Sequence, residues 1–209
     1  MAQKLKDETR TAIIDAARKE FLEKGYEDAS MRNIAANAGI TVGNIYRYFD
    51  SKEELSRYIM SSSSDKMKKL LDSLKIERLS KEPRVFDTQI DLTELTKMMD
   101  SLSYGFVRLY DENEEDFQIL LNDPSLNKMI KNWFEDTFRK IILPSYMTID
   151  RSREKEVLCH AYAVAVFDGL KEIFAESYED REELYSIVRT YLENFMKMVY
   201  QNEENRKYR

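Results

Sequence analysis

Apolar side chains recur at spacings of three and four residues along most of the chain, which is the period of an amphipathic α-helix. Glycine and proline are scarce, with five glycines and three prolines in 209 residues. Gly25, Gly39 and the three prolines fall between the periodic segments. A β-rich or loop-rich fold would use more of both residue types. The pattern therefore predicts an all-α protein.

One local pattern reads as two short helices joined by a tight turn and followed by the start of a third helix. Ser30 can cap the first helix, and Gly39 follows that helix where its end needs a left-handed backbone. Thr41 can cap the second helix, and Ser51 with Glu54 can form a capping box for the third. Helix, short turn with glycine, and helix is the helix-turn-helix pattern, whose second helix enters the major groove of DNA.

This stretch resembles the helix-turn-helix of the tetracycline-repressor (TetR) family of bacterial regulators. Residues 9–25 are similar to the first helix of that family, and the run IYRYFDSKEEL from Ile45 is its most recognisable signature. The resemblance implies an N-terminal three-helix DNA-binding domain at residues 1–50. In this family the rest of the chain, residues 51–209, is usually a helical ligand-binding and dimerisation domain of divergent sequence.

The helix predicted from about residue 51 to residue 75 connects these two domains. Its apolar stripe is interrupted by four serines, Ser61 to Ser64. Serine is a mediocre helix former, so the run could be a break. We expect one continuous helix instead, with Ser62 and Ser63 at inward positions where small side chains permit close approach.

The resemblance also implies which residues meet DNA. Arg32 matches a residue that can read a base edge, since the forked guanidinium of arginine suits the two acceptors of guanine. The alternative is that Arg32 contacts a phosphate or is simply a surface residue. Tyr46 and Lys52 match the phosphate contacts of the family, and Tyr48 faces either DNA or the apolar interior of the motif. The predicted DNA-binding residues are Arg32, Thr41, Gly43, Asn44, Tyr46, Arg47, Tyr48 and Lys52.

Spacing supports part of this assignment. Val42, Ile45 and Phe49 repeat at helical spacing and are predicted to form the buried face of the second helix. The opposite face then carries Thr41, Gly43, Asn44 and Arg47. A glycine on that face lets the backbone approach DNA closely, and an asparagine can bond a base or a phosphate.

The net charge of −6 is unevenly divided along the chain. Residues 1–70 carry +2 and residues 71–209 carry −8, so the positive potential lies at the predicted DNA-reading end. The single cysteine excludes an intramolecular disulfide and suits a reducing cytosol. No apolar run approaches the roughly 20 residues of a membrane span. We expect a cytoplasmic protein with no membrane contact.

Catalytic chemistry has little support in the sequence. His160 is the only histidine, and its neighbour Cys159 points about 100° away on a helix. The sequence has no glycine-rich phosphate loop and no nucleophile elbow. We therefore expect no enzymatic activity, no catalytic residues, no metal site and no cofactor.

Two groups of residues in the C-terminal part suggest binding surfaces. The run from Val157 to Phe174 is apolar nearly all round, so most of its circumference must be buried. With the amphipathic helix that follows, it resembles the paired helices that make a four-helix dimer interface in the TetR family. The predicted interface residues are Ala161, Ala165, Gly169, Leu192 and Phe195. A purely intramolecular core is the alternative.

The second group surrounds a predicted ligand cavity between helices. Aromatic walls with a few polar groups are typical of such cavities, and the candidates are Tyr104, Arg108, Trp133 and His160. The alternative is that these residues are ordinary core. Asp168 lies near His160 on the same helix, and burying it unpaired would cost free energy, so we expect it to pair with Lys171.

Together these patterns predict a homodimeric, TetR-like transcriptional regulator that binds a near-palindromic double-stranded operator. Repression is the usual mode of the family, and a small-molecule effector bound in the C-terminal domain should release the DNA. The alternative is a DNA-binding dimer of the same fold, without a small-molecule ligand, that is controlled by a protein partner. An apolar cavity in the C-terminal domain favours the first possibility, and a solid core favours the second.

Overall fold

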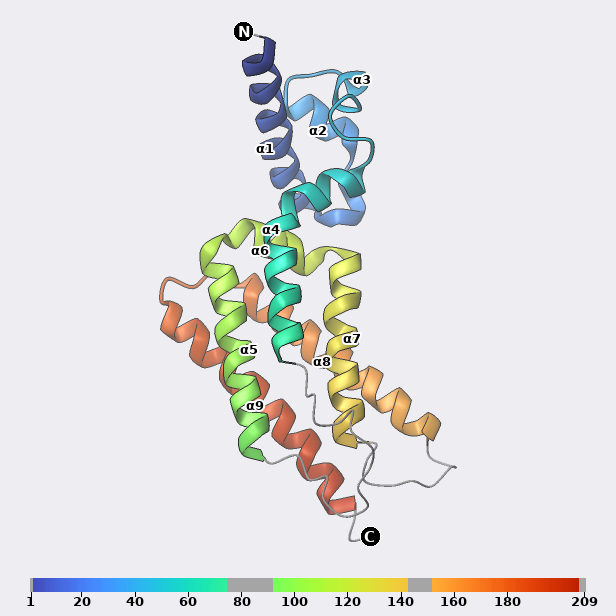
Figure 1. Cartoon of the computed structure of the whole chain (residues 1–209), viewed down its shortest axis with the longest axis vertical. Helices are drawn as coiled ribbons and strands as arrows, with labels where there is room; N and C mark the ends of the chain where they lie inside the picture. Colours follow the sequence, from blue (N-terminus) through green and yellow to red (C-terminus); the bar gives the residue numbers. More distant parts are fainter. Residues whose placement is uncertain (1, 75–91, 143–151, 207–209) are drawn as a thin grey trace. The chain divides into compact units, whose positions relative to one another are not determined.

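The computed structural model describes residues 2–74, 92–142 and 152–206, and every regular element in these ranges is an α-helix (Figure 1). This confirms the predicted all-α class. None of the helices in the described ranges has the long apolar stretch that crossing a bilayer requires. In chain order the helices are α1 (Ala2–Asp28), α2 (Met31–Asn37), α3 (Val42–Ile45), α4 (Lys52–Ser73), α5 (Leu92–Glu112), α6 (Glu114–Asn122), α7 (Pro124–Ile142), α8 (Ser152–Ala175) and α9 (Arg181–Arg206).

Punctuation in the sequence marks several of these boundaries. Gly25 interrupts the regular helix of α1 with a φ of 73°, a backbone conformation that glycine adopts without strain. Pro124 opens α7, and Asp123 caps it by accepting from the backbone amides of the two residues after the proline. Pro83 and Pro144, which the sequence also placed between helices, lie outside the described residues.

The chain divides into two compact units. Unit 1 comprises Met1–Lys66 and Glu112–Asn127, and unit 2 comprises Met67–Asp111 and Lys128–Arg209. This division differs from a boundary at residue 50, because unit 1 also takes in the first part of α4 and all of α6. Leu55 and Ile59, in this first part of α4, are both buried.

The core of unit 1 begins with α1. Ile13, Ala17 and Phe21, spaced by four, are buried there. Glu20 lies on the same helix and is only 1% exposed. Its Oε1 accepts hydrogen bonds from the Asn33 side chain at 2.9 Å and from the Lys24 ammonium at 3.2 Å. Burial favours the neutral form, but these bonds outweigh it and hold the pKa of Glu20 below its ordinary value, so a charged carboxylate joins α1 to α2.

Helix α6 packs against α1 although nearly 100 residues separate them in the sequence. The Arg18 guanidinium donates to both carboxylate oxygens of Asp116, at 2.8 and 3.2 Å. Phe117 and Leu120 of α6 are fully buried. Asn113 caps the helix by accepting from the Asp116 amide. The two hydrogen bonds of the guanidinium and the buried apolar face of α6 together hold this helix in unit 1.

Unit 2 is built around aromatic side chains. On α5, the side chains of Leu102 and Phe106 are fully buried. Phe106 packs on Phe174 of α8, with ring centroids 6.2 Å apart. Trp133 of α7 is 8% exposed and donates from its indole nitrogen to the carbonyl of Leu71 at 2.9 Å.

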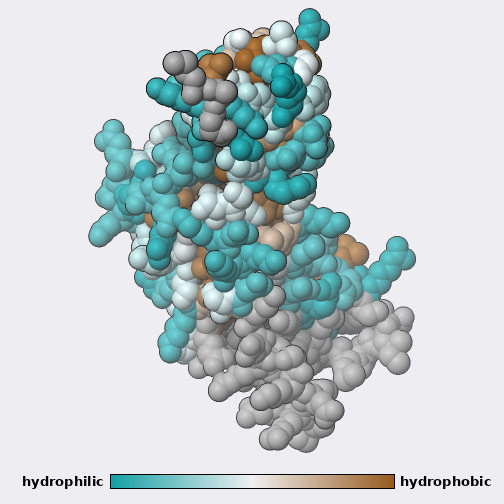
Figure 2. Space-filling view, turned by 45° about the horizontal axis from the view of Figure 1, so that its top comes forward, coloured by the Kyte–Doolittle hydropathy of each residue, from teal (hydrophilic) through white to brown (hydrophobic). Residues whose placement is uncertain are grey.

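The face of the molecule in Figure 2 is mostly hydrophilic over the described residues, with apolar groups in small separate areas, as expected when the large apolar side chains fill the cores.

Helix α4 is continuous across the serine run, as predicted. The inward position predicted for Ser62 is wrong, because that side chain is exposed, and Ser63 is half-buried. The buried stripe passes instead through Met60 and Met67, which are 3% and 0% exposed. These residues are seven apart, so two turns of helix carry the stripe past the serines without using them.

Candidate DNA-binding interface

The helix-turn-helix forms through the local bonds that the sequence predicts. The Asn33 amide donates to the Ser30 hydroxyl at 3.2 Å, and the Asn44 amide donates to the Thr41 hydroxyl at 3.3 Å, so both helices have side-chain caps. Gly39 takes a φ of 71° in the turn between them. This left-handed conformation is the reason for a glycine at that position.

The cap of α4 follows the predicted box with one difference. The Glu54 amide donates to the Ser51 hydroxyl at 3.1 Å. The carboxylate of Glu54 reaches back one residue further than the usual box and accepts from the Asp50 amide at 2.6 Å. The bonds fix the end of the motif to the start of α4.

Helix α3 is one turn long and is anchored by two apolar residues. Ile45 is 0% exposed and Phe49, just after the helix, is 1% exposed, as predicted. The prediction that Val42 shares this buried face is wrong, because Val42 is 41% exposed. A helix of four residues has too little length for a full apolar stripe, so the burial falls on its end and on the turn that follows.

The outer side of α3 carries most of the predicted DNA contacts. Thr41, Gly43 and Arg47 are exposed and Asn44 is half-buried. Together with Gly39 and Ile40 they line an open hollow of about 800 Å³. Tyr46 is 48% exposed and Arg32 on α2 is exposed, whereas Tyr48 is half-buried. The structure thus brings four of the eight predicted residues to one concave surface.

Lys52 has a different setting from an exposed phosphate contact. Its ammonium donates to the carbonyls of Tyr26, Glu27 and Ala29 at 2.6, 3.0 and 3.0 Å. It also lies 4.6 Å from the centre of the Tyr26 ring. An ammonium has three donors, so a bond to phosphate would have to replace one of these carbonyls. Lys52 therefore anchors the start of α4 to the end of α1.

A second anchor involves Arg10, which the sequence did not single out. Its guanidinium lies 5.4 Å from the ring centre of Phe49 and 4.9 Å from that of Tyr58. The two rings meet edge to face with centroids 5.5 Å apart. These contacts fix α1 and α4 against the end of the helix-turn-helix.

The four predicted ligand-pocket residues lie in different surroundings. Tyr104 and Arg108 line a groove of about 660 Å³ in unit 2, with residues from the start of α9. Trp133 is buried and bonded to a backbone carbonyl, as described above. His160 is exposed on α8 and its Nδ1 lies 3.0 Å from a carboxylate oxygen of Glu135. The apolar pattern could not separate these directions, because it does not fix how α7 and α8 are rotated.

The predicted pairing of Asp168 with Lys171 is also absent. Asp168 instead meets Lys131 of α7 at 3.0 Å, and its side chain is 55% exposed. No burial penalty arises for an aspartate in that position. Within the part of the chain that the structure describes, no group of three or more metal-ligating side chains gathers.

The predicted dimer residues lie in two environments. Ala161 and Ala165 are exposed on α8, and Gly169 is half-buried. Leu192 has no exposed surface and belongs to the core of unit 2, so it is not available to a partner. Phe195 is half-buried in an aromatic cluster with Phe138, Tyr162 and Tyr191.

Tyr191 explains the glycine on α8. Its hydroxyl donates to the carbonyls of Ala165 and Val166 at 3.0 and 3.2 Å. A β-carbon at Gly169 would lie 2.1 Å from that hydroxyl oxygen. At Gly169, a predicted dimer residue, the close helix packing is therefore a contact within one chain, between α8 and α9.

A capped helix-turn-helix with an exposed second helix, buried on one side by Ile45 and Phe49, defines a DNA-binding unit of the helix-turn-helix class. Residues 13–59 match the family described as bacterial regulatory proteins, tetR family. Residues 13–59 thus carry the DNA-binding domain of the TetR family of transcriptional regulators.

Curated relatives match over part of the chain. The chain is similar to the uncharacterised regulator YfiR of Bacillus subtilis (strain 168), with 34% identity over 67 residues that cover 32% of this chain and 33% of YfiR. It is similar to the regulator SrpR of Pseudomonas putida, with 41% identity over 56 residues that cover 27% of this chain and 26% of SrpR. The matched region thus spans about a third or less of the length of these relatives.

Solved structures extend the likeness of the fold to the rest of the chain. A TetR family transcriptional regulator from Chloroflexus aurantiacus J-10-FL superposes with a TM-score of 0.55 and 16% identity, over 94% of this chain and 93% of that one. A TetR-family regulator from Bordetella parapertussis 12822 gives 0.53 and 15%, over 89% and 93%. The helices after the helix-turn-helix therefore follow the same fold with a divergent sequence.

Proposed function

We propose that this chain is a cytoplasmic homodimeric repressor that binds a near-palindromic operator and leaves it when a small molecule binds unit 2. The observation that supports DNA reading is the exposed hollow around Gly43, Asn44 and Arg47, which Ile45 and Phe49 hold outward from a closed core. Two copies of this surface, about 34–36 Å apart, would enter successive major grooves on one side of the duplex.

Individual roles follow from side-chain chemistry. Arg47 and Asn44 offer donors that suit base edges or phosphates, and Thr41 offers a hydroxyl at the start of α3. Gly43 lets the α3 backbone come close to DNA. Tyr46 contacts a phosphate through its hydroxyl. Tyr48 and Lys52 support the motif from within, and Lys52 reaches DNA only by giving up one of its carbonyl partners.

Two substitutions distinguish base reading from phosphate contact. Arg32→Ala should weaken operator binding by roughly 1–3 kcal/mol and relax the preference at one base pair. Tyr46→Phe should weaken operator and scrambled duplexes by a similar amount, about 1 kcal/mol, because a phosphate contact carries no sequence information. Fluorescence anisotropy with both duplexes, at one fixed salt concentration, measures this. An Arg32→Ala protein with unchanged base preference would remove Arg32 from base reading.

We assign dimerisation to the exposed side of α8. Val157 is 60% exposed there, and Ala161 and Ala165 continue the same surface at four-residue spacing. Met198 on α9 is 45% exposed. Exposed apolar side chains on paired helices suit the self-complementary interface of a two-fold dimer.

Ala161→Arg tests this assignment. Because a two-fold axis brings like charges together, the change should raise the dissociation constant of the dimer by about a hundredfold. Ser101→Arg, at an exposed position of α5 in the same unit, is the matched control and should leave assembly unchanged. Sedimentation velocity across a range of protein concentrations separates the two outcomes. A stable Ala161→Arg dimer would exclude this side of α8 from the interface.

The groove between α5 and α9 is our candidate effector site. It carries two of the predicted residues, Tyr104 and Arg108, together with Arg181 and Tyr185. The Nε of Arg181 donates to a carboxylate oxygen of Asp111 at 3.0 Å, and the Arg181 guanidinium lies 4.8 Å from the Tyr110 ring centre. The mixed aromatic and charged lining suits a small polar molecule with a planar part. To release DNA, the effector must bind the conformation that cannot bind DNA more tightly than the one that can. The factor by which the effector lowers the affinity for DNA then equals the factor by which DNA lowers the affinity for the effector.

A further inference from the structure

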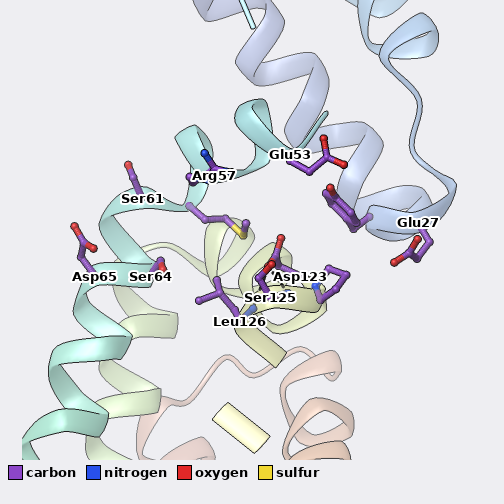
Figure 3. A pocket seen from close by; sticks show the side chains of 12 residues that line it. Glu27, Glu53, Arg57, Ser61, Ser64, Asp65, Asp123, Ser125 and Leu126 are labelled. Atoms are coloured by element: carbon purple, nitrogen blue, oxygen red, sulfur yellow. Dashed lines mark hydrogen bonds between the residues drawn. The ribbon is translucent and has the colours of Figure 1, made fainter. Parts of the chain in front are cut away.

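Unit 1 contains a cavity of about 690 Å³ that the DNA-reading surface does not use (Figure 3). Cavities that hold small organic ligands are typically about 300–1,000 Å³, so the size is sufficient. Side chains from three parts of unit 1 line it: the end of α1, the part of α4 from Glu53 to Asp65, and the first turn of α7 with its cap Asp123. These are elements that the Lys52 anchor and the Asp123 cap already hold in place.

The wall of the cavity is partly apolar. The side chains of Met60 and Leu126 are buried, at 3% and 8% exposure. The ring of Tyr26 and the ring of Pro124 add to this surface. An aromatic ring, a thioether and an aliphatic side chain give favourable contacts to an apolar ligand body and to a cation near the ring face.

The charges around the cavity are mainly negative. Four carboxylates and one guanidinium line it, namely Glu27, Glu53, Asp65, Asp123 and Arg57, which is a net charge of −3. Asp123 accepts from two amides at the start of α7, so its charge is largely compensated. Glu27 and Asp65 form no ion pair or side-chain hydrogen bond with any residue that the structure describes.

On one wall of the cavity, the neutral phenol of Tyr26 is hydrogen-bonded to the charged carboxylate of Glu53. Burial, followed by the nearby Glu53, raises the pKa of Tyr26 to about 12, so the phenol stays protonated and its hydroxyl donates to that carboxylate. Bonds from its own amide and from Ser51 hold the pKa of Glu53 below its ordinary value. The wall is therefore anionic throughout the physiological pH range.

We propose that this cavity binds an organic monocation with an apolar body, at a site within unit 1 that is separate from the groove of unit 2. The carboxylates of Glu27, Glu53 and Asp65 attract the cation, and Met60, Leu126 and the Tyr26 ring contact its body. The ligand also touches Tyr26, whose backbone carbonyl and ring both contact the Lys52 ammonium. Occupancy therefore acts directly on the anchor that joins α4 to the end of α1.

Two ions of the same shape and opposite charge test the proposal. Calorimetric titration of the full chain, without DNA, should show tetraphenylphosphonium binding about tenfold or more tightly than tetraphenylborate. Equal binding of both ions would show apolar contact alone, and preferred binding of the borate would show that Arg57 dominates the site. Either result overturns the proposal, as does the absence of binding by the phosphonium.

Matched variants locate the site. The double variant Glu27→Gln/Asp65→Asn removes two lining charges and should weaken phosphonium binding by about tenfold. Glu23→Gln/Asp28→Asn removes two exposed carboxylates of the same unit that do not line the cavity, and it should change binding by about twofold at most. Equal losses in both variants would indicate a general charge effect and overturn the site. Because no DNA is present, failure here leaves the proposed operator binding untouched.

Discussion

Replacing Gly43 with tryptophan should abolish sequence-specific DNA binding without disturbing the fold. No atom lies within 4 Å of a β-carbon built at Gly43, and the residue is exposed. The free energy of unfolding should therefore change by no more than about 0.5 kcal/mol. If the backbone of α3 lies against the major groove, however, an indole at this position occupies the space of a base pair edge. We expect operator affinity to fall by about a hundredfold or more.

Two controls sharpen this experiment. Gly43→Ala should give a smaller loss, because a methyl group fills less of the interface. Ser101→Trp places the same side chain at an exposed position of unit 2 and should bind DNA as the parent chain does. Anisotropy titrations and thermal unfolding on the three variants separate binding from stability. Normal operator binding by Gly43→Trp would show that α3 does not lie in the groove.

Asp116→Ala should destabilise unit 1 more than any exposed substitution on the same helix. The change removes both hydrogen bonds to Arg18 and leaves a guanidinium whose side chain is only 29% exposed. Loss of one partner of a largely buried pair costs several kcal/mol, and partial solvent access to Arg18 reduces this to about 2–3 kcal/mol. Denaturant unfolding followed by circular dichroism measures the difference.

Glu115→Ala is the matched control for that measurement. Glu115 lies in the same first turn of α6 and is exposed, so its removal takes away the same favourable interaction with the helix dipole. The expected cost is about 0.5 kcal/mol. A double-mutant cycle with Arg18→Ala should then give a coupling energy of about 1–3 kcal/mol between Arg18 and Asp116. A coupling near zero would mean that the pair does not hold α6 on α1.

Local signals in the sequence predicted the helix-turn-helix well. The Ser30 cap, the Thr41 cap and the left-handed Gly39 are each local features that depend only on residues a few positions away. The structure contains all three. The same locality explains why the run around Ile45 carried the family resemblance.

Long-range pairs were not accessible in this way. The bond between Arg18 and Asp116 joins positions 98 residues apart, and nothing in their local surroundings marks them as partners. The anchor at Lys52 depends on carbonyls at the end of α1, which have no side-chain signature. The sequence suggested Trp133 as an aromatic wall and His160 as a polar group of one cavity, yet Trp133 is buried and His160 is exposed.

Selection of bound duplexes from a random DNA pool tests the central claim most directly, with the parent chain and the Gly43→Trp variant compared at one salt concentration. We predict that the parent chain enriches an inverted repeat whose half-sites are about 34–36 Å apart, or a multiple of the helical turn. The variant should enrich nothing. A pool that stays random with the parent chain, or the same motif enriched by both proteins, would contradict DNA reading through α3.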